Sequence, residues 1–202
     1  MQLVEYYKKH TECYSISEKV FDKLSAKQNG AGIVLVTKIV FPNYLEYDYT
    51  DKMILVCDGI EISSNIGTIF RTSEALNVDL IIFTNPKAKV LDNKVVHASR
   101  GMIFNVPFVI VDEVQYVMNT LAKNHVTAII CKPEQGEDFK NFDYSGSIAL
   151  VVGSERYGVS KCWFEEPNNK YLKIKMFGEM DSLNVAVATS LILYEAKYNR
   201  KK

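Results

Sequence analysis

The sequence from Met53 to Thr72 reads MILVCDGIEISSNIGTIFRT. It opens with an unbroken apolar run, Met53 to Cys57, which is typical of a strand buried on both faces of a parallel sheet. Apolar residues then recur at helical spacing, and Ser63 or Ser64 is placed to cap that helix. A buried strand that leads into a helix is the repeating unit of α/β proteins.

The same alternation extends along the rest of the chain. Six more apolar runs are predicted as strands: 33–36, 80–83, 106–111, 126–131, 148–152 and 172–176. The last run alternates with lysine, as an edge or half-exposed strand would. Helices are predicted at 15–27, 65–76, 113–123 and 183–198, the last beginning near Asp181 or Ser182. The pattern predicts an α/β fold with a mainly parallel sheet and helices on both faces.

Composition narrows the class of protein. The chain has 202 residues, and 48% of them are hydrophobic, which is enough for a sizeable core. Its 24 basic and 24 acidic residues cancel, so nucleic acid must be bound by a local patch and not by net charge. The four cysteines are too scattered for a metal or redox pair, and no metal site is expected. Without a leader or a long apolar run, a soluble cytoplasmic protein that does not enter membranes is expected.

A change of composition suggests a domain boundary. Residues 41–52 are polar and rich in tyrosine, and we interpret them as a linker or long loop. It would join a short N-terminal segment, residues 1–50, to a main domain, residues 51–202.

Two further segments place polar residues and glycines after predicted strands. One is Gly153 to Gly158, of the form Gly-x-Glu-x-x-Gly, and the other is Ile174 to Ala188. Open α/β sheets bind ligands at such strand ends. Each segment alone is weak support for a site, because capped helices with surface charges explain them as well. The Gly-x-Glu-x-x-Gly form is neither a Walker loop nor a dinucleotide fingerprint.

Taken together and in order, the three segments resemble the motifs of the SpoU (TrmH) family of S-adenosylmethionine-dependent RNA 2′-O-ribose methyltransferases, in the SPOUT superfamily. The matching residues are Asn65, Gly67, Arg71 and Thr72; Gly153, Glu155 and Gly158; and Ile174, Met176, Gly178, Ser182, Leu183, Asn184 and Val185. Residues 98–107 resemble the family's Ser-x-Gly loop. The likeness covers roughly residues 53–198. Lys175 departs from the family's usual proline, and Ala186 from a common serine.

The resemblance implies several properties of the molecule. The fold would carry a C-terminal trefoil knot around residues 150–185. The protein would be a homodimer, with helices 65–76 and 183–198 near the interface. Residues 16–38 resemble the end of an RNA-binding domain that many members carry in front. The partner would be a transfer or ribosomal RNA, and the cofactor S-adenosylmethionine.

The resemblance also implies residue roles. Cofactor binding would fall to Gly153, Ile174, Met176, Gly178, Ser182 and Leu183, and catalysis to Arg71, Asn65, Glu155, Ser182 and Asn184. Arg71 would act either as a base or as a clamp on the target phosphate. We favour the clamp, because arginine stays protonated in proteins. Asn65 would orient Arg71, although six helical residues place the two on different faces unless Asn65 lies in the cap.

RNA would be contacted by cations near this cleft. The candidates are Arg71, Arg100, Arg156, Lys161 and Lys175. Simple surface solvation explains Arg156 and Lys161 equally well. Two alternatives to an RNA methyltransferase stay open: a catalytically weak RNA- or cofactor-binding module with the same fold, and a methyltransferase that acts on a protein or small molecule.

Overall fold

The computed structural model describes residues 2–25, 32–132 and 136–200. The chain divides into two compact units, Met1–Ile39 and Val40–Lys202. The described part of the first unit contains two helices, α1 (Gln2–His10) and α2 (Glu18–Leu24). The predicted helix 15–27 is therefore shorter than expected at its start, and its predicted end lies outside the described residues.

The strand predicted at 33–36 is wrong. These residues form no strand, and Ile33, Leu35 and Val36 are exposed. A strand needs a neighbour to accept and donate its backbone hydrogen bonds, and the described part of the first unit offers none. The likeness of this unit to the end of an RNA-binding domain stays a prediction.

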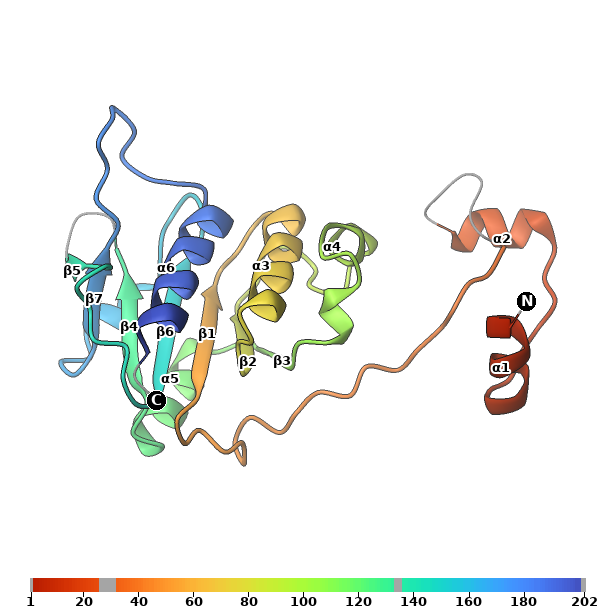
Figure 1. Ribbon diagram of the computed structural model, residues 1–202, viewed down its shortest axis with the longest axis horizontal. Coiled ribbons are helices and arrows are strands. Elements are labelled where there is room, and N and C mark those ends of the chain that lie inside the picture. The colour runs from red at the N-terminus through yellow and green to blue at the C-terminus, as the bar shows by residue number, and fades with distance from the viewer. Residues whose placement is uncertain (1, 26–31, 133–135, 201–202) are drawn as a thin grey trace. The chain divides into compact units, whose positions relative to one another are not determined.

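The second unit is built on a parallel sheet of seven strands (Figure 1). The strands are β1 (Met53–Asp58), β2 (Leu80–Thr84), β3 (Phe108–Val111), β4 (Thr127–Cys131), β5 (Glu137–Asp138), β6 (Ile148–Gly153) and β7 (Lys170–Lys173). Their order is β3-β2-β1-β6-β4-β7-β5, and every pair is parallel. The predicted parallel α/β fold is confirmed. The knot around residues 150–185 stays a prediction.

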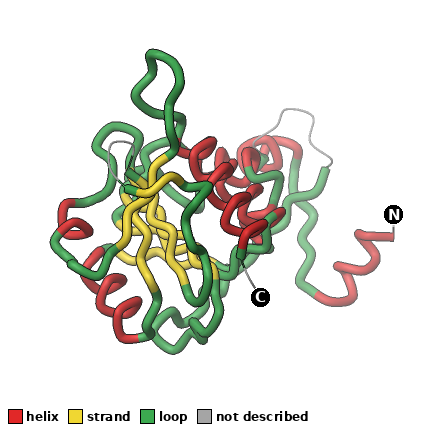
Figure 2. The backbone as a smooth tube through the Cα atoms, turned by 60° about the vertical axis from the view of Figure 1, so that its left-hand side comes forward, coloured by secondary structure: helices red, strands yellow, loops and turns green. Residues whose placement is uncertain are grey.

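Both faces of the sheet are covered by helices, as Figure 2 shows. The helices of this unit are α3 (Ser63–Ala75), α4 (Asn93–Ala98), α5 (Val114–Lys123) and α6 (Val185–Asn199), with short 3₁₀ turns η1 (Met102–Phe104) and η2 (Lys161–Phe164). In Figure 1, α3, α4 and α6 lie on the side of the sheet nearer the viewer. Coverage on both sides explains why every residue of β1 and β2 is buried.

Two predicted helix starts need correction. Neither Ser63 nor Ser64 caps α3, because the carbonyl of Ile62 already accepts the first helical hydrogen bonds, from the N–H groups of Asn65 and Ile66. The last helix begins later than predicted. Its cap is Asn184, whose side-chain oxygen accepts from the backbone N–H groups of Ala186 and Val187.

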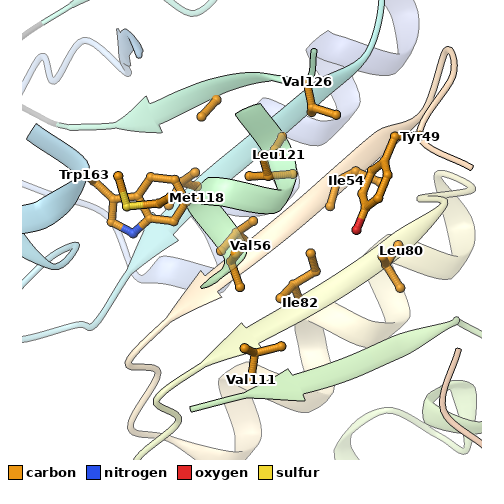
Figure 3. Packing of buried hydrophobic residues seen from close by; sticks show 14 of the residues in the cluster. Tyr49, Ile54, Val56, Leu80, Ile82, Val111, Met118, Leu121, Val126 and Trp163 are labelled. Carbon is orange, nitrogen blue, oxygen red and sulfur yellow. The ribbon is translucent and has the colours of Figure 1, made fainter. Parts of the chain in front are cut away.

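Residues 41–52 are more than the predicted linker. Tyr49 is only 3% exposed and belongs to the core cluster between the sheet and α5, where it packs beside Ile54 and Leu80 (Figure 3). Its hydroxyl donates to the backbone oxygen of Tyr44 at 2.6 Å. Burial of the ring outweighs the local polarity on which the linker interpretation rested.

Candidate functional site

Three segments meet at the carboxyl edge of the sheet. Strands β1 and β6 are direct neighbours, with Asp58 opposite Gly153 at their ends. The loop that leads into α3 and the turn after β6 therefore start side by side. Helix α6 packs against α3 (Figure 1), which brings its N-terminus to the same place.

A hydrogen-bonded network, Asn65–Glu155–Asn184, joins these three segments. The side-chain amide of Asn65 donates to Oε1 of Glu155 at 2.5 Å, and the amide of Asn184 donates to Oδ1 of Asn65 at 3.2 Å. Asn65 is 7% exposed, so both of these bonds replace bonds to water. An asparagine suits this central position because its amide both donates and accepts.

Two residues that the sequence did not single out support this network. The backbone N–H of Glu61 donates to Oε2 of Glu155 at 3.1 Å, so both carboxylate oxygens of Glu155 are held. The hydroxyl of Ser154 in turn donates to the carboxylate of Glu61 at 2.6 Å. Both residues sit beside motif positions, but only the contact across the two loops shows what they do.

Asp58 is a further buried carboxylate at this edge. It is 2% exposed, and it accepts from the hydroxyl of Thr84 at 3.0 Å and from the backbone N–H of Ser160 at 2.7 Å. These bonds tie the end of the turn after β6 to the sheet. The sequence feature that indicates this structural role is a charged residue at the end of an apolar strand.

Arg71 lies apart from the network. It is exposed and sits nearly two turns after Asn65 on α3, and its side chain forms no hydrogen bond or ion pair within the described residues. Asn65 therefore does not contact Arg71 here and is bonded to Glu155 and Asn184 instead. The next residue, Thr72, pairs its hydroxyl with that of Ser190 on α6 at 2.9 Å.

A pocket opens between the ends of β4 and β7 and the start of α6. The pocket is open to solvent, and the empty space in and around its mouth is about 380 Å³. The lining residues are Cys131, Lys132, Leu172, Lys173, Ile174, Met176, Ser182, Leu183, Ala188 and Ile192. Four of the six residues proposed for the cofactor are among them. Gly153 and Gly178 are not.

The two remaining glycines differ in their surroundings. A side chain at Gly153 would overlap backbone atoms of Gly158 and Val159, so this glycine closes the turn after β6. A side chain at Gly178 would meet nothing within 4 Å. Gly67, in α3, is also required for packing, because an added Cβ would lie 2.8 Å from the backbone nitrogen of Ser99.

The thiol of Cys131, which lines the pocket, is unreactive as a nucleophile. Burial raises the pKa of Cys131 to about 12, so the thiol stays protonated at neutral pH. A thiolate nucleophile is therefore not part of this pocket. Among the described residues there is also no cluster of histidine, cysteine and acidic side chains that could hold a metal ion.

The five cations proposed for RNA contact are all exposed. They are Arg71, Arg100, Arg156, Lys161 and Lys175, and none of them forms an ion pair in the described part of the chain. Arg100 has a left-handed backbone, with φ at +52°. It occupies the position after α4 where glycine is usual. No helix in the described residues is long and apolar enough to cross a membrane.

Comparison with known proteins agrees with this geometry. A protein of Staphylococcus aureus (strain COL) assigned to the TrmH family of tRNA/rRNA methyltransferases is 34% identical over 142 residues, which cover 70% of this chain and 57% of that protein. The structure of the SpoU methyltransferase AviRb from Streptomyces viridochromogenes, in complex with AdoMet, matches with a TM-score of 0.68 at 30% identity, covering 74% of this chain and 60% of AviRb.

A crystal structure of an rRNA methyltransferase from Sinorhizobium meliloti shares the fold with a TM-score of 0.88 at 22% identity, covering 98% of this chain and 77% of that one. The match with the Staphylococcus aureus protein described above covers little more than half of that protein's length. Residues 52–194 match the SpoU rRNA Methylase family. That match contains all three motif segments and both ends of the network, and the chain belongs to the SpoU rRNA methylase family.

Proposed function

We propose that this protein transfers the methyl group of S-adenosylmethionine to a ribose 2′-hydroxyl of RNA. The observation that carries the proposal is the network Asn65–Glu155–Asn184, which draws three motif segments together at one edge of the sheet. Membership of the family and the tRNA/rRNA methyltransferases among the relatives support RNA as the substrate. The motif residues that resemble 2′-O-ribose methyltransferases support the ribose hydroxyl as acceptor.

The pocket fits the proposed cofactor. Its lining is mostly apolar with a few polar groups, as is usual for small-molecule sites. Ile174, Met176 and Leu183 would hold the nucleoside and the methionine chain, and Ser182 would hydrogen-bond a polar group. S-adenosylmethionine supplies an electrophilic methyl group on a sulfonium. AviRb, which is similar over most of this chain, has been solved with this cofactor.

Arg71 would act on the RNA and not on the cofactor. It does not line the pocket, and its guanidinium is free to bind a phosphate in a bidentate manner. A phosphate held there would orient the ribose, and the positive charge would stabilise the negative charge that develops on the 2′-oxygen as its proton passes to water. Glu155, Ser182 and Asn184 would shape the site, and Asn65 would hold Glu155 and Asn184 in place.

We also propose a homodimer. Helix α6 exposes an apolar stripe formed by Val187, Leu191, Tyr194 and Tyr198. These residues are spaced as one face of a helix. Helix α3 adds less than expected to such an interface, because its Ile66, Ile69 and Phe70 are fully buried in the core of the same chain. A monomer at high concentration in light scattering would contradict the dimer.

The decisive experiment is incubation of the purified chain with radiolabelled S-adenosylmethionine and total RNA. Digestion to nucleosides then shows whether the label sits in 2′-O-methylnucleosides. Label on a base would contradict ribose transfer. Binding of the cofactor by calorimetry with no transfer to any RNA would favour the binding module, and label in protein would favour a protein substrate.

A further inference from the structure

Two aromatic side chains at the carboxyl edge of the sheet are exposed. Tyr157, in the turn after β6, is 76% exposed, and Phe177, in the loop after β7, is 89% exposed. The loop between β7 and α6 projects beyond the sheet at the upper left of Figure 1. Phe70, Phe83 and Phe108, by contrast, pack on one another in the core. Exposed rings by themselves are common on protein surfaces, and these two are of interest because they lie at the edge that carries the site.

Each exposed ring has a cation against its face. The guanidinium carbon of Arg156 lies 5.3 Å from the ring centroid of Tyr157, and Nζ of Lys175 lies 5.3 Å from that of Phe177. Neither cation forms an ion pair within the described residues. Protein and lipid surfaces also bind rings and cations together, and membership of the SpoU rRNA methylase family favours nucleic acid as the partner. Single-stranded nucleic acid uses both, because a base stacks on the ring while the adjoining phosphate meets the cation.

The turn that carries Tyr157 is held rigidly. Ser154 and Gly158 exchange two backbone hydrogen bonds, each 2.9 Å long. The hydroxyl of Ser154 accepts from the N–H of Tyr157 at 3.1 Å and donates to Glu61, which anchors the turn to the loop before α3. A backbone fixed before binding saves the entropy of ordering it.

Both rings lie close to the proposed site. Tyr157 follows Glu155 by two residues, and Phe177 follows the pocket residue Met176. Strand β4 lies between β6 and β7, so the ends of those two strands are about 10 Å apart, twice the spacing of adjacent strands. Cys131 ends β4 and lines the pocket. The rings and the pocket therefore share one edge.

We propose that Tyr157 and Phe177 are stacking platforms for unpaired RNA bases, with Arg156 and Lys175 on the adjoining phosphates. The substrate is then bound as a single strand or loop and not as a duplex, because base faces are accessible only when bases are unstacked. This inference rests on the proposed function for its choice of RNA. It adds two binding residues, both at variable positions of the motif segments, and it names the form of RNA.

The test measures RNA binding without the cofactor. The probe is a fluorescein-labelled short RNA of adenosine and cytidine only, which cannot pair with itself, and fluorescence anisotropy gives its affinity. Tyr157→Leu and Phe177→Leu, which keep an apolar side chain but remove the ring, should each weaken binding about 5- to 150-fold. Tyr157→Phe should bind as the wild type does. The duplex of this RNA with its complementary strand should bind more weakly, and neither substitution should change its affinity much.

The control is Tyr116→Leu, which removes an exposed tyrosine from α5. Helix α5 covers the face of the sheet away from α3 and α6 (Figure 1), so this substitution should leave RNA affinity unchanged. Wild-type affinity of both ring variants would overturn the proposal. So would a change of oligomeric state with unchanged RNA affinity, which would assign the rings to a contact between copies. Because the assay needs no methyl transfer, failure of the proposed reaction and failure of the platforms give different results. Calorimetry with S-adenosylmethionine should show equal cofactor affinity in all variants.

Discussion

The network Asn65–Glu155–Asn184 and the arginine Arg71 come from the same motifs, yet their side chains differ in the bonds that they form. The network residues bond to one another, and Asn65 is buried. Arg71 is exposed and unpaired within the described residues. A buried amide without partners costs about 1–3 kcal/mol, whereas an exposed guanidinium stays hydrated until a ligand arrives. The difference separates residues that build the site from a residue that is available to act on the substrate.

The largest effect is expected at Arg71. Arg71→Ala should slow methyl transfer on the order of 100- to 1,000-fold while stability and cofactor affinity stay near those of the wild type. Arg71→Lys should rescue poorly, because an ammonium cannot make the bidentate contact. Single-turnover transfer and cofactor titration test both variants, with Lys123→Ala on α5 as the control cation. Near wild-type transfer by Arg71→Ala would show that Arg71 has no part in the mechanism and does not differ in function from other surface cations.

The two glycines outside the pocket sharpen the same contrast. Gly153→Ala should cost about 3 kcal/mol of folding free energy, because the new Cβ meets the backbone of Gly158 and Val159 and the turn must shift. Gly178→Ala, with open space around it, should change stability by less than about 0.5 kcal/mol. Denaturant unfolding of the two variants gives both values. Equal losses of folding free energy in the two variants would show that Gly153 does not pack against the backbone of Gly158 and Val159.

Asn65 tests the network directly. Asn65→Ala removes the partner that Glu155 and Asn184 share, and the free energy of unfolding should fall by about 1–3 kcal/mol. The melting temperature should fall by about 2–4 °C per kcal/mol for a chain of this size. Asn119→Ala, which loses one exposed hydrogen bond to Gln115, is the matched control and should change little. A melting temperature equal to that of the wild type would show that the network does not contribute to stability.

The smallest effect concerns Tyr49, far from the site. Burial raises the pKa of Tyr49 from its ordinary value of 10.0 to about 12. Its contribution to stability is therefore complete below pH 10 and is lost as the pH rises toward 12. Tyr49→Phe should cost about 0.5–1.5 kcal/mol at pH 8, through the lost bond to Tyr44. It should also lose less stability than the wild type between pH 10 and 12, and parallel pH curves for the two proteins would contradict this.

The strands that sequence predicted well are those with both faces buried. Such strands need apolar residues at every position, and β1, β2, β4 and β6 follow that rule closely enough to be located in advance. The run at 33–36 has the same composition and forms no strand, because composition does not supply a neighbour. The two-residue β5 and the short α4 carry too few residues to show a period and were not predicted.

For the site, the sequence determined the motif residues and their order along the chain. Only the tertiary structure decided which of them touch. Asn65 meets Glu155 and Asn184, which are 90 and 119 residues away, and not Arg71 on its own helix. The physical reason is that a residue's face on a helix is set by local geometry, whereas its partners are set by strand order. Here β6 lies beside β1 in the sheet although four strands, β2 to β5, come between them in sequence. Local periodicity carries no record of that order.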